Sequence, residues 1–433
     1  MATVRVGPPR RPLAGSFGVP GDKSIAHRAL LLGGLADGVT TVLGFPRGAD
    51  VLSSLGAVRA LGARVDELPD DALRIEGCGH ALGGGPATID CGNSGTTMRL
   101  TAGLVAGGGG TVVLDGDASL RRRPMERVAD PLRAMGAGVE TTDGHAPLTV
   151  RGAALRGIEW TLPVASAQVK SAILLAGLRA HGTTRVREPL PSRDHTERLL
   201  GHMGVRLARD AAGVAIAGEQ RLRGGDISLP GDCSSAAFLV VAALVVPGSE
   251  LHLTDIGVNP TRTGALAILR RMGGAIDVTK THDVAGEPRA ELHVRAARLR
   301  GTHVTPGEVP GTIDELPILA IAAALADGET TITGAAELRV KESDRIAALE
   351  QLARLGVGVR ATPDGLSIHG RGGRPLVGGR VETHGDHRIA MAFAVAGLVA
   401  EDGVEIDGAE CADVSFPGFY ARLAELGAQV ERG

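Results

Sequence analysis

The sequence is poor in aromatic residues and in cysteine, and each shortage limits the kind of protein it encodes. Phe, Trp and Tyr make up 2% of the 433 residues, whereas hydrophobic residues as a whole make up 43%. The core must therefore be packed mainly with Ala, Val and Leu. The four cysteines include no Cys-X-X-Cys pair, which indicates reduced thiols in a cytoplasmic protein.

A long hydrophobic run and an excess of positive charge are also missing. No run approaches the roughly 18 uncharged apolar residues of a membrane span, and the opening MATVRVGPPRR has no apolar segment of the signal-peptide type. The net charge of −3 gives no reason to expect a nucleic acid or an anionic membrane as a partner. We expect a cytoplasmic monomer without such partners.

Lysine is scarce as well. Only four of the 46 basic residues are lysine, namely Lys23, Lys170, Lys280 and Lys341. Because an ammonium group is a point charge and a guanidinium group a planar fork, the two are not interchangeable at a binding site. Three of the four lysines lie in or beside short polar segments that open apolar helices, which is not the pattern of random surface placement.

The chain does contain a unit of about seventy residues repeated six times. Its clearest mark is a Leu-Gly or Met-Gly pair that ends a helical stretch before a β-prone run. Glycine just past a helix end adopts the left-handed conformation that other residues reach only at a cost, so each pair predicts a helix C-terminus. The pairs are Leu61-Gly62, Met135-Gly136, Met203-Gly204, Met272-Gly273, Leu355-Gly356 and Leu426-Gly427.

Each unit is predicted to combine helices with a few strands. In the fifth copy, a polar turn opens an apolar helix at Ile313, and a short strand follows at Thr330–Ala335. Apolar residues at i, i+3 and i+4 then predict an amphipathic helix over Ser343–Gly356. Two β-prone runs complete the copy, at Val357–Thr362 and Leu366–Gly370. The fold class is therefore α/β.

The two ends of the chain suggest how the repeats are grouped. The sixth copy stops soon after Gly427 without its last strand, whereas Thr3–Gly7 is a β-prone run with no unit of its own. We expect this N-terminal strand to complete the last repeat. Three repeats then form an N-terminal domain over residues 20–229, and three form a C-terminal domain over residues 1–19 and 230–433.

The polar segments that open the six apolar helices differ in their charges. Helix capping accounts for Asp232, since Asp, Asn and Ser are the preferred N-caps. It does not account for Lys23, Arg28 and Arg388, because cations in a first turn oppose the positive end of the helix dipole. An anion bound between these cations and the free N–H groups would remove the conflict. We therefore expect a small acidic ligand that carries phosphate and carboxylate groups.

Further cations lie outside these openings. Arg121–Arg123 come just before a proline that we expect to start a helix. Lys341 and Arg345 would fall one turn apart on the next amphipathic helix and share a face with Asp344 nearby. A solvated, salt-bridged helix start would explain this last stretch equally well.

Eight segments, in order along the whole chain, resemble the 5-enolpyruvylshikimate-3-phosphate synthase family. They are GDKSIAHRALLL, GNSGTTMRL, RRRP, SAQVKSA, RDHTERLL, IDELPILA, RVKESDR and GDHRIAMAF. The resemblance implies a two-domain enolpyruvyl transferase fold, an inside-out α/β barrel with three α/β repeats per domain and helix N-termini that face an interdomain cleft. It also implies the reaction. The enolpyruvyl group of phosphoenolpyruvate is transferred to the 5-hydroxyl of shikimate 3-phosphate, phosphate is released, and the product leads to chorismate and the aromatic amino acids.

The resemblance further implies roles for individual residues. The expected phosphoenolpyruvate contacts are Lys23, Asn93, Gly95, Thr96, Arg123, Gln168, Arg345 and Arg388. The expected shikimate 3-phosphate contacts are Lys23, Ser24, Arg28, Ser166, Ala167, Gln168, Arg193, Asp314 and Lys341. The expected proton-transfer groups are Asp314 and Glu342, with Lys23 a third candidate, and the sequence leaves open which group performs which transfer. We expect no cofactor and no metal ion, since no second histidine lies at ligand spacing from His387.

Two positions depart from the common family pattern. Ala26 stands where many members have serine, and Val414 stands where many have a lysine two residues before a Phe-Pro pair. One branch of the family also lacks that lysine, and the segments SAQVKS, RDHTER and IDELP resemble that branch, so we still expect activity.

Three other interpretations remain. A UDP-N-acetylglucosamine enolpyruvyl transferase shares the fold, but Ala118 occupies the position where its reactive cysteine would fall, and no Lys-Asn pair follows Gly21. An RNA 3′-phosphate cyclase-type enzyme is disfavoured by the acidic net charge. A non-catalytic repeat scaffold would have similar helix openings in all six copies, whereas these have diverged.

Overall fold

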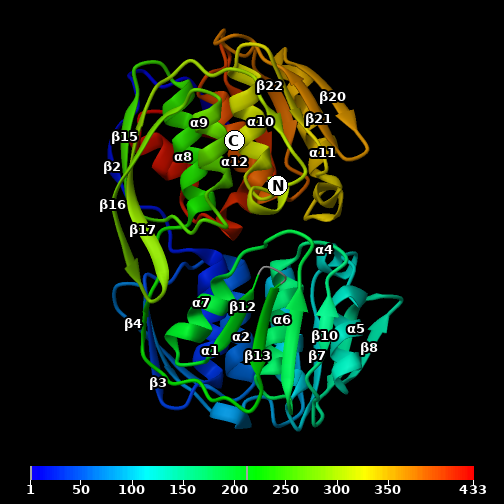
Figure 1. Cartoon of the computed structure of the whole chain (residues 1–433). Helices are drawn as coiled ribbons and strands as arrows, with labels where there is room; N and C mark the ends of the chain where they lie inside the picture. Colours follow the sequence, from blue (N-terminus) through cyan, green and yellow to red (C-terminus); the bar gives the residue numbers. More distant parts are fainter. Residues whose placement is uncertain (1, 211–212) are drawn as a thin grey trace. The chain divides into compact units, whose positions relative to one another are not determined.

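The computed structural model describes residues 2–210 and 213–433, which fall into two compact units (Figure 1). The N-terminal unit consists of Gly21–Pro230 and the short segment Asp283–Glu287. The C-terminal unit consists of the residues up to Pro20, Gly231–His282 and Pro288–Gly433.

Within the described residues, the N-terminal unit contains three four-stranded sheets. In each, the first strand runs parallel to its neighbour and the other pairs are antiparallel. The strand order in the first sheet is β14 (Asp226–Ser228), β3 (Val39–Leu43), β5 (Ala72–Glu76), β4 (Arg64–Leu68). In the second sheet it is β6 (Ala87–Asp90), β7 (Thr111–Asp115), β9 (His145–Arg151), β8 (Gly138–Thr142). In the third sheet it is β10 (Glu159–Thr161), β11 (Thr183–Arg187), β13 (Gly213–Ala217), β12 (Leu207–Asp210). The helices are α1 (Lys23–Leu35), α2 (Ala49–Ala60), α3 (Gly95–Ala106), α4 (Ala118–Arg121), α5 (Glu126–Met135), α6 (Ala167–Gly177) and α7 (His195–His202), with a 3₁₀ turn η1 (Gly79–Ala81).

The C-terminal unit repeats this plan. The strand order in its first sheet is β2 (Ala14–Phe17), β15 (Glu250–Gly257), β17 (Glu287–Arg295), β16 (Ala275–Val284). In its second sheet the order is β18 (His303–Val304), β19 (Glu329–Ile332), β21 (Gly365–His369), β20 (Gly358–Thr362). In its third sheet the order is β22 (Gly379–Glu382), β23 (Val404–Asp407), β1 (Thr3–Gly7), β24 (Gln429–Arg432). Its α-helices are α8 (Cys233–Val245), α9 (Gly264–Arg271), α10 (Leu316–Leu325), α11 (Arg345–Leu349), α12 (His387–Gly397) and α13 (Phe419–Glu425). Its 3₁₀ helices are η2 (Val309–Gly311), η3 (Ala336–Val340), η4 (Glu350–Leu355) and η5 (Ala409–Val414).

In both units, strands from distant parts of the chain pair within one sheet. Strand β1 lies between β23 and β24, with Val4 opposite both Ile406 and Arg432. Strand β14, from the end of the N-terminal unit, pairs with β3 near its start. The six sheets therefore share one strand order, and the α/β repeat predicted from the sequence is confirmed.

The glycine pairs mark helix ends as predicted. All six glycines have a left-handed backbone, with φ from +77° at Gly356 to +112° at Gly136. Gly136 and Gly356 are themselves the C-cap residues of α5 and η4. A side chain at these positions would be strained, so the recurrence of glycine follows from the backbone geometry.

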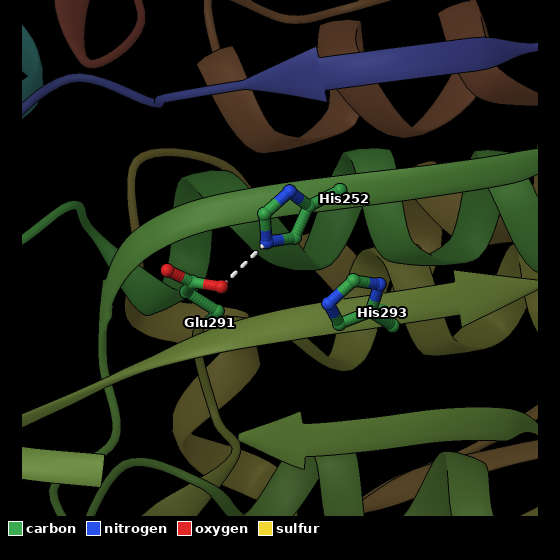
Figure 2. A group of neighbouring side chains, drawn as sticks. All are labelled: His252, Glu291 and His293. Atoms are coloured by element: carbon green, nitrogen blue, oxygen red, sulfur yellow. Dashed lines mark hydrogen bonds and ion pairs between the residues drawn. The ribbon is translucent and has the colours of Figure 1, made fainter. Parts of the chain in front are cut away.

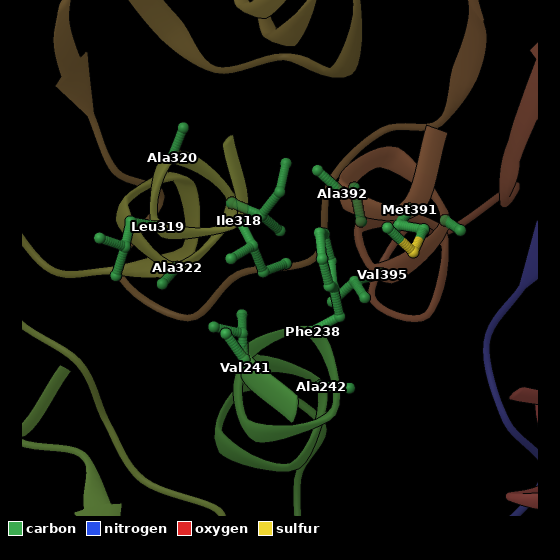
Figure 3. Packing of buried hydrophobic residues seen from close by; sticks show 14 of the residues in the cluster. Phe238, Val241, Ala242, Ile318, Leu319, Ala320, Ala322, Met391, Ala392 and Val395 are labelled. Atoms are coloured by element: carbon green, nitrogen blue, oxygen red, sulfur yellow. The ribbon is translucent and has the colours of Figure 1, made fainter. Parts of the chain in front are cut away.

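Three helices of each unit are almost entirely buried because they have no polar face. They are α1, α3 and α6 in the N-terminal unit and α8, α10 and α12 in the C-terminal unit. Every residue of α10 is buried, and so are eleven of the thirteen residues of α1. A helix that is apolar all round has to be covered on all sides. In the C-terminal unit, α8, α10 and α12 contact one another, and Phe238, Ile318 and Val395 lie together among them (Figure 3). The polar first turns of these helices are therefore held in place by a packed core.

Within the described residues, no helix is long and apolar enough to cross a membrane.

Candidate active site

The buried helices α1, α3 and α6 of the N-terminal unit begin with side-chain caps. The Asp22 carboxylate accepts from the Ile25 N–H at 2.9 Å, and the Ser94 hydroxyl accepts from the Thr97 N–H at 3.1 Å. The Ser166 hydroxyl likewise caps α6. Capping places Lys23, Gly95 and Ala167 at the first helical positions of α1, α3 and α6, where the remaining N–H groups favour an anion.

Arg28 ties α1 to two other helices. Its guanidinium donates to the Thr196 hydroxyl at 2.6 Å, to the Ser171 hydroxyl at 3.0 Å and to the Ser24 carbonyl at 2.7 Å. Burial is the main reason that the pKa of Arg28 falls to about 10, and the like charge of Arg193 lowers it further. Arg28 therefore remains a cation at neutral pH, and Arg193, in the loop before α7, lies near enough to affect it.

Lys23 is partly buried and paired. Its ammonium group lies 3.0 Å from a carboxylate oxygen of Asp50, and the two side chains are 15% and 12% exposed. Asp50 is in the first turn of α2. A carboxylate therefore neutralises Lys23 within the N-terminal unit.

Gln168 on α6 contacts Thr96 at the start of α3, and Arg99 joins them. The amide of Gln168 donates to the Thr96 hydroxyl at 2.9 Å and accepts from Arg99 at 2.6 Å. Gly95 leaves room for this arrangement, since a Cβ there would lie 2.6 Å from one Arg99 nitrogen and 3.3 Å from one Arg123 nitrogen. Glycine thus leaves space for two guanidinium groups close to the start of α3.

Asn93 links Arg123 to the same helix start. The Arg123 guanidinium donates to the Asn93 side-chain oxygen at 2.5 Å, and the Asn93 amide donates to Asp117 at 2.7 Å. Arg123 is 8% exposed, whereas Arg121 points to solvent and pairs with Asp115. Of the two, only Arg123 faces the predicted phosphoenolpyruvate contacts.

In the C-terminal unit, Arg345 is the centre of a second cluster. It is fully buried, and its guanidinium lies 2.7 Å from Asp386, 2.6 Å from Glu342 and 3.6 Å from Asp314. Burial alone would lower the pKa of Arg345, but the three surrounding carboxylates outweigh burial and raise it. Arg345 therefore stays charged and connects the two carboxylates predicted to transfer protons.

Arg388 lies at the second position of α12 and reaches the segment before α10. It donates to the Asp314 carbonyl at 3.0 Å, and its guanidinium lies 3.5 Å from the Asp314 carboxylate. Asp386 caps α12 by accepting from the Arg388 N–H at 2.9 Å while it also binds Arg345. One carboxylate thus caps α12 and also binds the Arg345 guanidinium.

The expected helix around Lys341 is wrong. Lys341 has an extended backbone after the 3₁₀ helix η3, and α11 begins only at Arg345. The amphipathic stretch then continues as the 3₁₀ helix η4. Lys341 and Arg345 therefore do not share a helix face. The half-buried Lys341 ammonium has a lowered pKa because of desolvation, an effect that the charge of Asp314 opposes.

The predicted residues thus lie in both units, and several of their polar partners were not predicted. Asp50, Arg99 and Asp386 hold Lys23, Gln168 and Arg345 respectively. Asp386 lies in the polar segment GDHRIAMAF and Arg99 in the segment GNSGTTMRL. The sequence of these two segments could therefore have indicated both residues as site partners. Asp50 had no such signal, because it is 27 residues from Lys23 in a helix of ordinary composition.

Solved structures and curated sequences support a single class. The enolpyruvyl transferase NikO from Streptomyces tendae matches with a TM-score of 0.80 at 19% identity, over 100% of this chain and 98% of that one, which shows the enolpyruvyl transferase fold. EPSP synthase from Acinetobacter baumannii matches with a TM-score of 0.89 at 42% identity, over 100% of both chains.

The family model for EPSP synthase (3-phosphoshikimate 1-carboxyvinyltransferase) matches residues 8–423. A 3-phosphoshikimate 1-carboxyvinyltransferase of Halorhodospira halophila is 55% identical over 97% of this chain and 95% of its own length. One of Synechococcus sp. strain JA-3-3Ab is 52% identical over 96% and 95%. The chain belongs to the EPSP synthase family.

Proposed function

We propose that the protein transfers the enolpyruvyl group of phosphoenolpyruvate to the 5-hydroxyl of shikimate 3-phosphate, in the shikimate pathway to chorismate and the aromatic amino acids. The observation that carries this proposal is similarity along almost the whole chain to relatives named for that reaction. The two clusters support it, since polyanionic substrates require cations and helix N-termini.

We assign the residues of the two clusters to the two substrates by the charge and shape of their side chains. The forks of Arg123, Arg345 and Arg388 suit the planar carboxylate and the phosphate of phosphoenolpyruvate. Asn93, Gly95, Thr96 and Gln168 line the start of α3 beside Arg123. For shikimate 3-phosphate, the proposed contacts are Lys23, Ser24, Arg28, Ser166, Ala167, Gln168, Arg193, Asp314 and Lys341.

The chemistry proceeds by addition and then elimination. In the addition, the 5-hydroxyl oxygen bonds to C2 of phosphoenolpyruvate while a base takes the hydroxyl proton and an acid gives a proton to the methylene carbon. In the elimination, that carbon returns a proton and phosphate leaves, so the carbon–carbon double bond is restored. Asp314 and Glu342 are the proposed proton-transfer groups, and Lys23 is the third candidate.

We expect phosphate release only when both substrates are present, and we expect it to survive removal of metal ions, because each proposed electrophilic group is a side chain. The measurement is phosphate release with shikimate 3-phosphate and phosphoenolpyruvate together, with each alone, and with UDP-N-acetylglucosamine as acceptor. Full loss of activity in a chelator, restored by a divalent ion, would contradict the metal-free mechanism. Release with the sugar nucleotide but not with shikimate 3-phosphate would replace the proposed acceptor.

Arg123→Lys should raise the KM for phosphoenolpyruvate roughly tenfold, because a point charge replaces a fork and one charge-assisted hydrogen bond is lost. Arg121→Lys is a matched control from the same segment, since Arg121 is 54% exposed and pairs with Asp115; we expect steady-state kinetics within about twofold of the unchanged protein. An unchanged KM for phosphoenolpyruvate with weaker binding of shikimate 3-phosphate would show that Arg123 is assigned to the wrong substrate.

We also infer a cytoplasmic monomer that binds no nucleic acid. The net charge of −3 and the four cysteines without a Cys-X-X-Cys pair support this inference. Light scattering of the purified protein, with and without added nucleic acid, tests the oligomeric state and the absence of that partner.

A further inference from the structure

Two histidines and a glutamate converge on one face of a sheet in the C-terminal unit. His252 on β15 lies directly opposite His293 on β17, and Glu291 is two residues before His293 on the same strand. Because side chains alternate between the faces of a strand, all three lie on one face, while Leu251, Leu292 and Val294 are buried on the other. Figure 2 shows the three side chains together.

The distances suit a shared ion. The nearest ligand atoms of the three side chains all lie within 4.8 Å of one another. A tetrahedral zinc ion about 2.0–2.1 Å from each nitrogen or oxygen holds its ligand atoms about 3.3 Å apart. Small side-chain rotations close that difference. The backbone positions are already fixed by strand pairing, which makes for a more precise site than loops would.

Neighbouring groups are arranged to support coordination by His252. Its Nε2 faces a Glu291 oxygen at 2.8 Å, and its Nδ1 lies 3.1 Å from the Ser16 hydroxyl on β2. A hydroxyl both donates and accepts. Ser16 therefore serves Nδ1 when Nε2 carries the proton, and equally when an ion occupies Nε2 and the proton is on Nδ1. A hydrogen bond to the second ring nitrogen is the usual companion of a metal-bound histidine.

His293 completes the arrangement. Its ring stacks on that of His252, with centroids 4.2 Å apart and planes at 15°. Two imidazoles this close would repel each other if both were protonated, whereas two neutral imidazoles can share one cation. Glu291 adds a carboxylate oxygen to the two imidazoles, while its other oxygen accepts a hydrogen bond from Lys280 at 2.9 Å.

From this geometry we propose that His252, Glu291 and His293 bind a divalent transition-metal ion, for which Zn²⁺ is the reference case. Two imidazole nitrogens and one carboxylate oxygen suit Zn²⁺, Co²⁺, Ni²⁺ or Cu²⁺, whereas Mg²⁺ and Ca²⁺ prefer oxygen ligands throughout. The ion would join β15 to β17 on the outer face of the sheet. The site is separate from the residues proposed for catalysis and does not depend on their function.

Lys280 provides a distinctive test. Its ammonium group lies 2.9 Å from the second oxygen of Glu291 and is 72% exposed. It competes with a cation for this carboxylate, so Lys280→Gln should tighten metal binding roughly threefold to tenfold. If the two histidines had only a structural role, Lys280→Gln would not raise the affinity for the metal ion.

The experiment is calorimetric titration of ZnCl₂ into the untagged, chelator-treated full-length protein, with visible absorption of bound Co²⁺ as a second readout. We expect one saturable site in the micromolar range, at least tenfold weaker in His252→Ala and His293→Ala and unchanged in His303→Ala. His303 is an exposed histidine of the same unit, bonded to Thr331. Thermal unfolding without metal checks that each variant is folded. No saturable binding, or equal binding by the His293→Ala and unchanged proteins, would overturn the proposal.

Discussion

Glu342→Gln and Asp314→Asn should each lower turnover on the order of 10²- to 10⁴-fold while the variants still fold and bind shikimate 3-phosphate. The amide keeps the size of each side chain and removes its ability to exchange a proton. The measurement is single-turnover phosphate release together with equilibrium binding of shikimate 3-phosphate, so that loss of chemistry is separated from loss of substrate.

Residues other than these two carboxylates occupy the N-cap positions of α10 and α11. Helix α11 is capped by Asp344, which accepts from the Ala347 N–H at 3.1 Å, and α10 begins after Glu315 without a side-chain cap. Asp344→Asn is therefore the matched control, since asparagine caps as well as aspartate. We expect this variant to keep most of its turnover.

Retention of more than about a tenth of turnover in both Glu342→Gln and Asp314→Asn would remove proton transfer from both residues. Lys23, paired with Asp50 at 3.0 Å, would then be the leading candidate. A large loss in only one variant would assign one transfer to that carboxylate and make Lys23 the group to test for the other.

Arg345→Met should lower the free energy of unfolding of the C-terminal unit by about 3–5 kcal/mol, because it leaves buried carboxylates without their cation. Asp386 is as fully buried as Arg345, and their closest atoms are 2.7 Å apart. The measurement is denaturant unfolding followed by probes in each unit, since two units of this size need not unfold together.

Arg380→Met is the control for this loss. Arg380 is in the same unit and lies 2.6 Å from Asp407 and 3.3 Å from Glu405, but it is 63% exposed. Solvent screens such pairs, so we expect a change below about 1 kcal/mol. Equal losses in the two variants would mean that the charges around Arg345 are not responsible for the effect.

Local patterns in the sequence were enough to predict the repeat and the helix ends. The left-handed backbone at Gly62, Gly136 and Gly427 depends on the absence of a Cβ, which is a property of the residue itself. The apolar helices could likewise be recognised because a run such as that from Leu316 to Leu325 has no polar face to expose.

The helix around Lys341 shows where local reasoning failed. Apolar spacing over Ser343–Gly356 predicted one amphipathic helix, but the backbone is extended at Lys341, and the stretch is divided between α11 and η4. Arg345 is held from outside its own helix by Asp386, 41 residues away in sequence. Periodicity carries no information about such a partner.

By itself, then, the sequence determined the α/β repeat, the polar helix starts and the family resemblance, because each depends on residues close together in the chain. The tertiary structure alone decided which carboxylate pairs with which cation, as Asp50 does with Lys23 and Asp386 with Arg345. It also alone placed His252 opposite His293, through the register of β15 and β17. These contacts join residues far apart in sequence, and only the packing of whole helices and strands brings such residues within bonding distance.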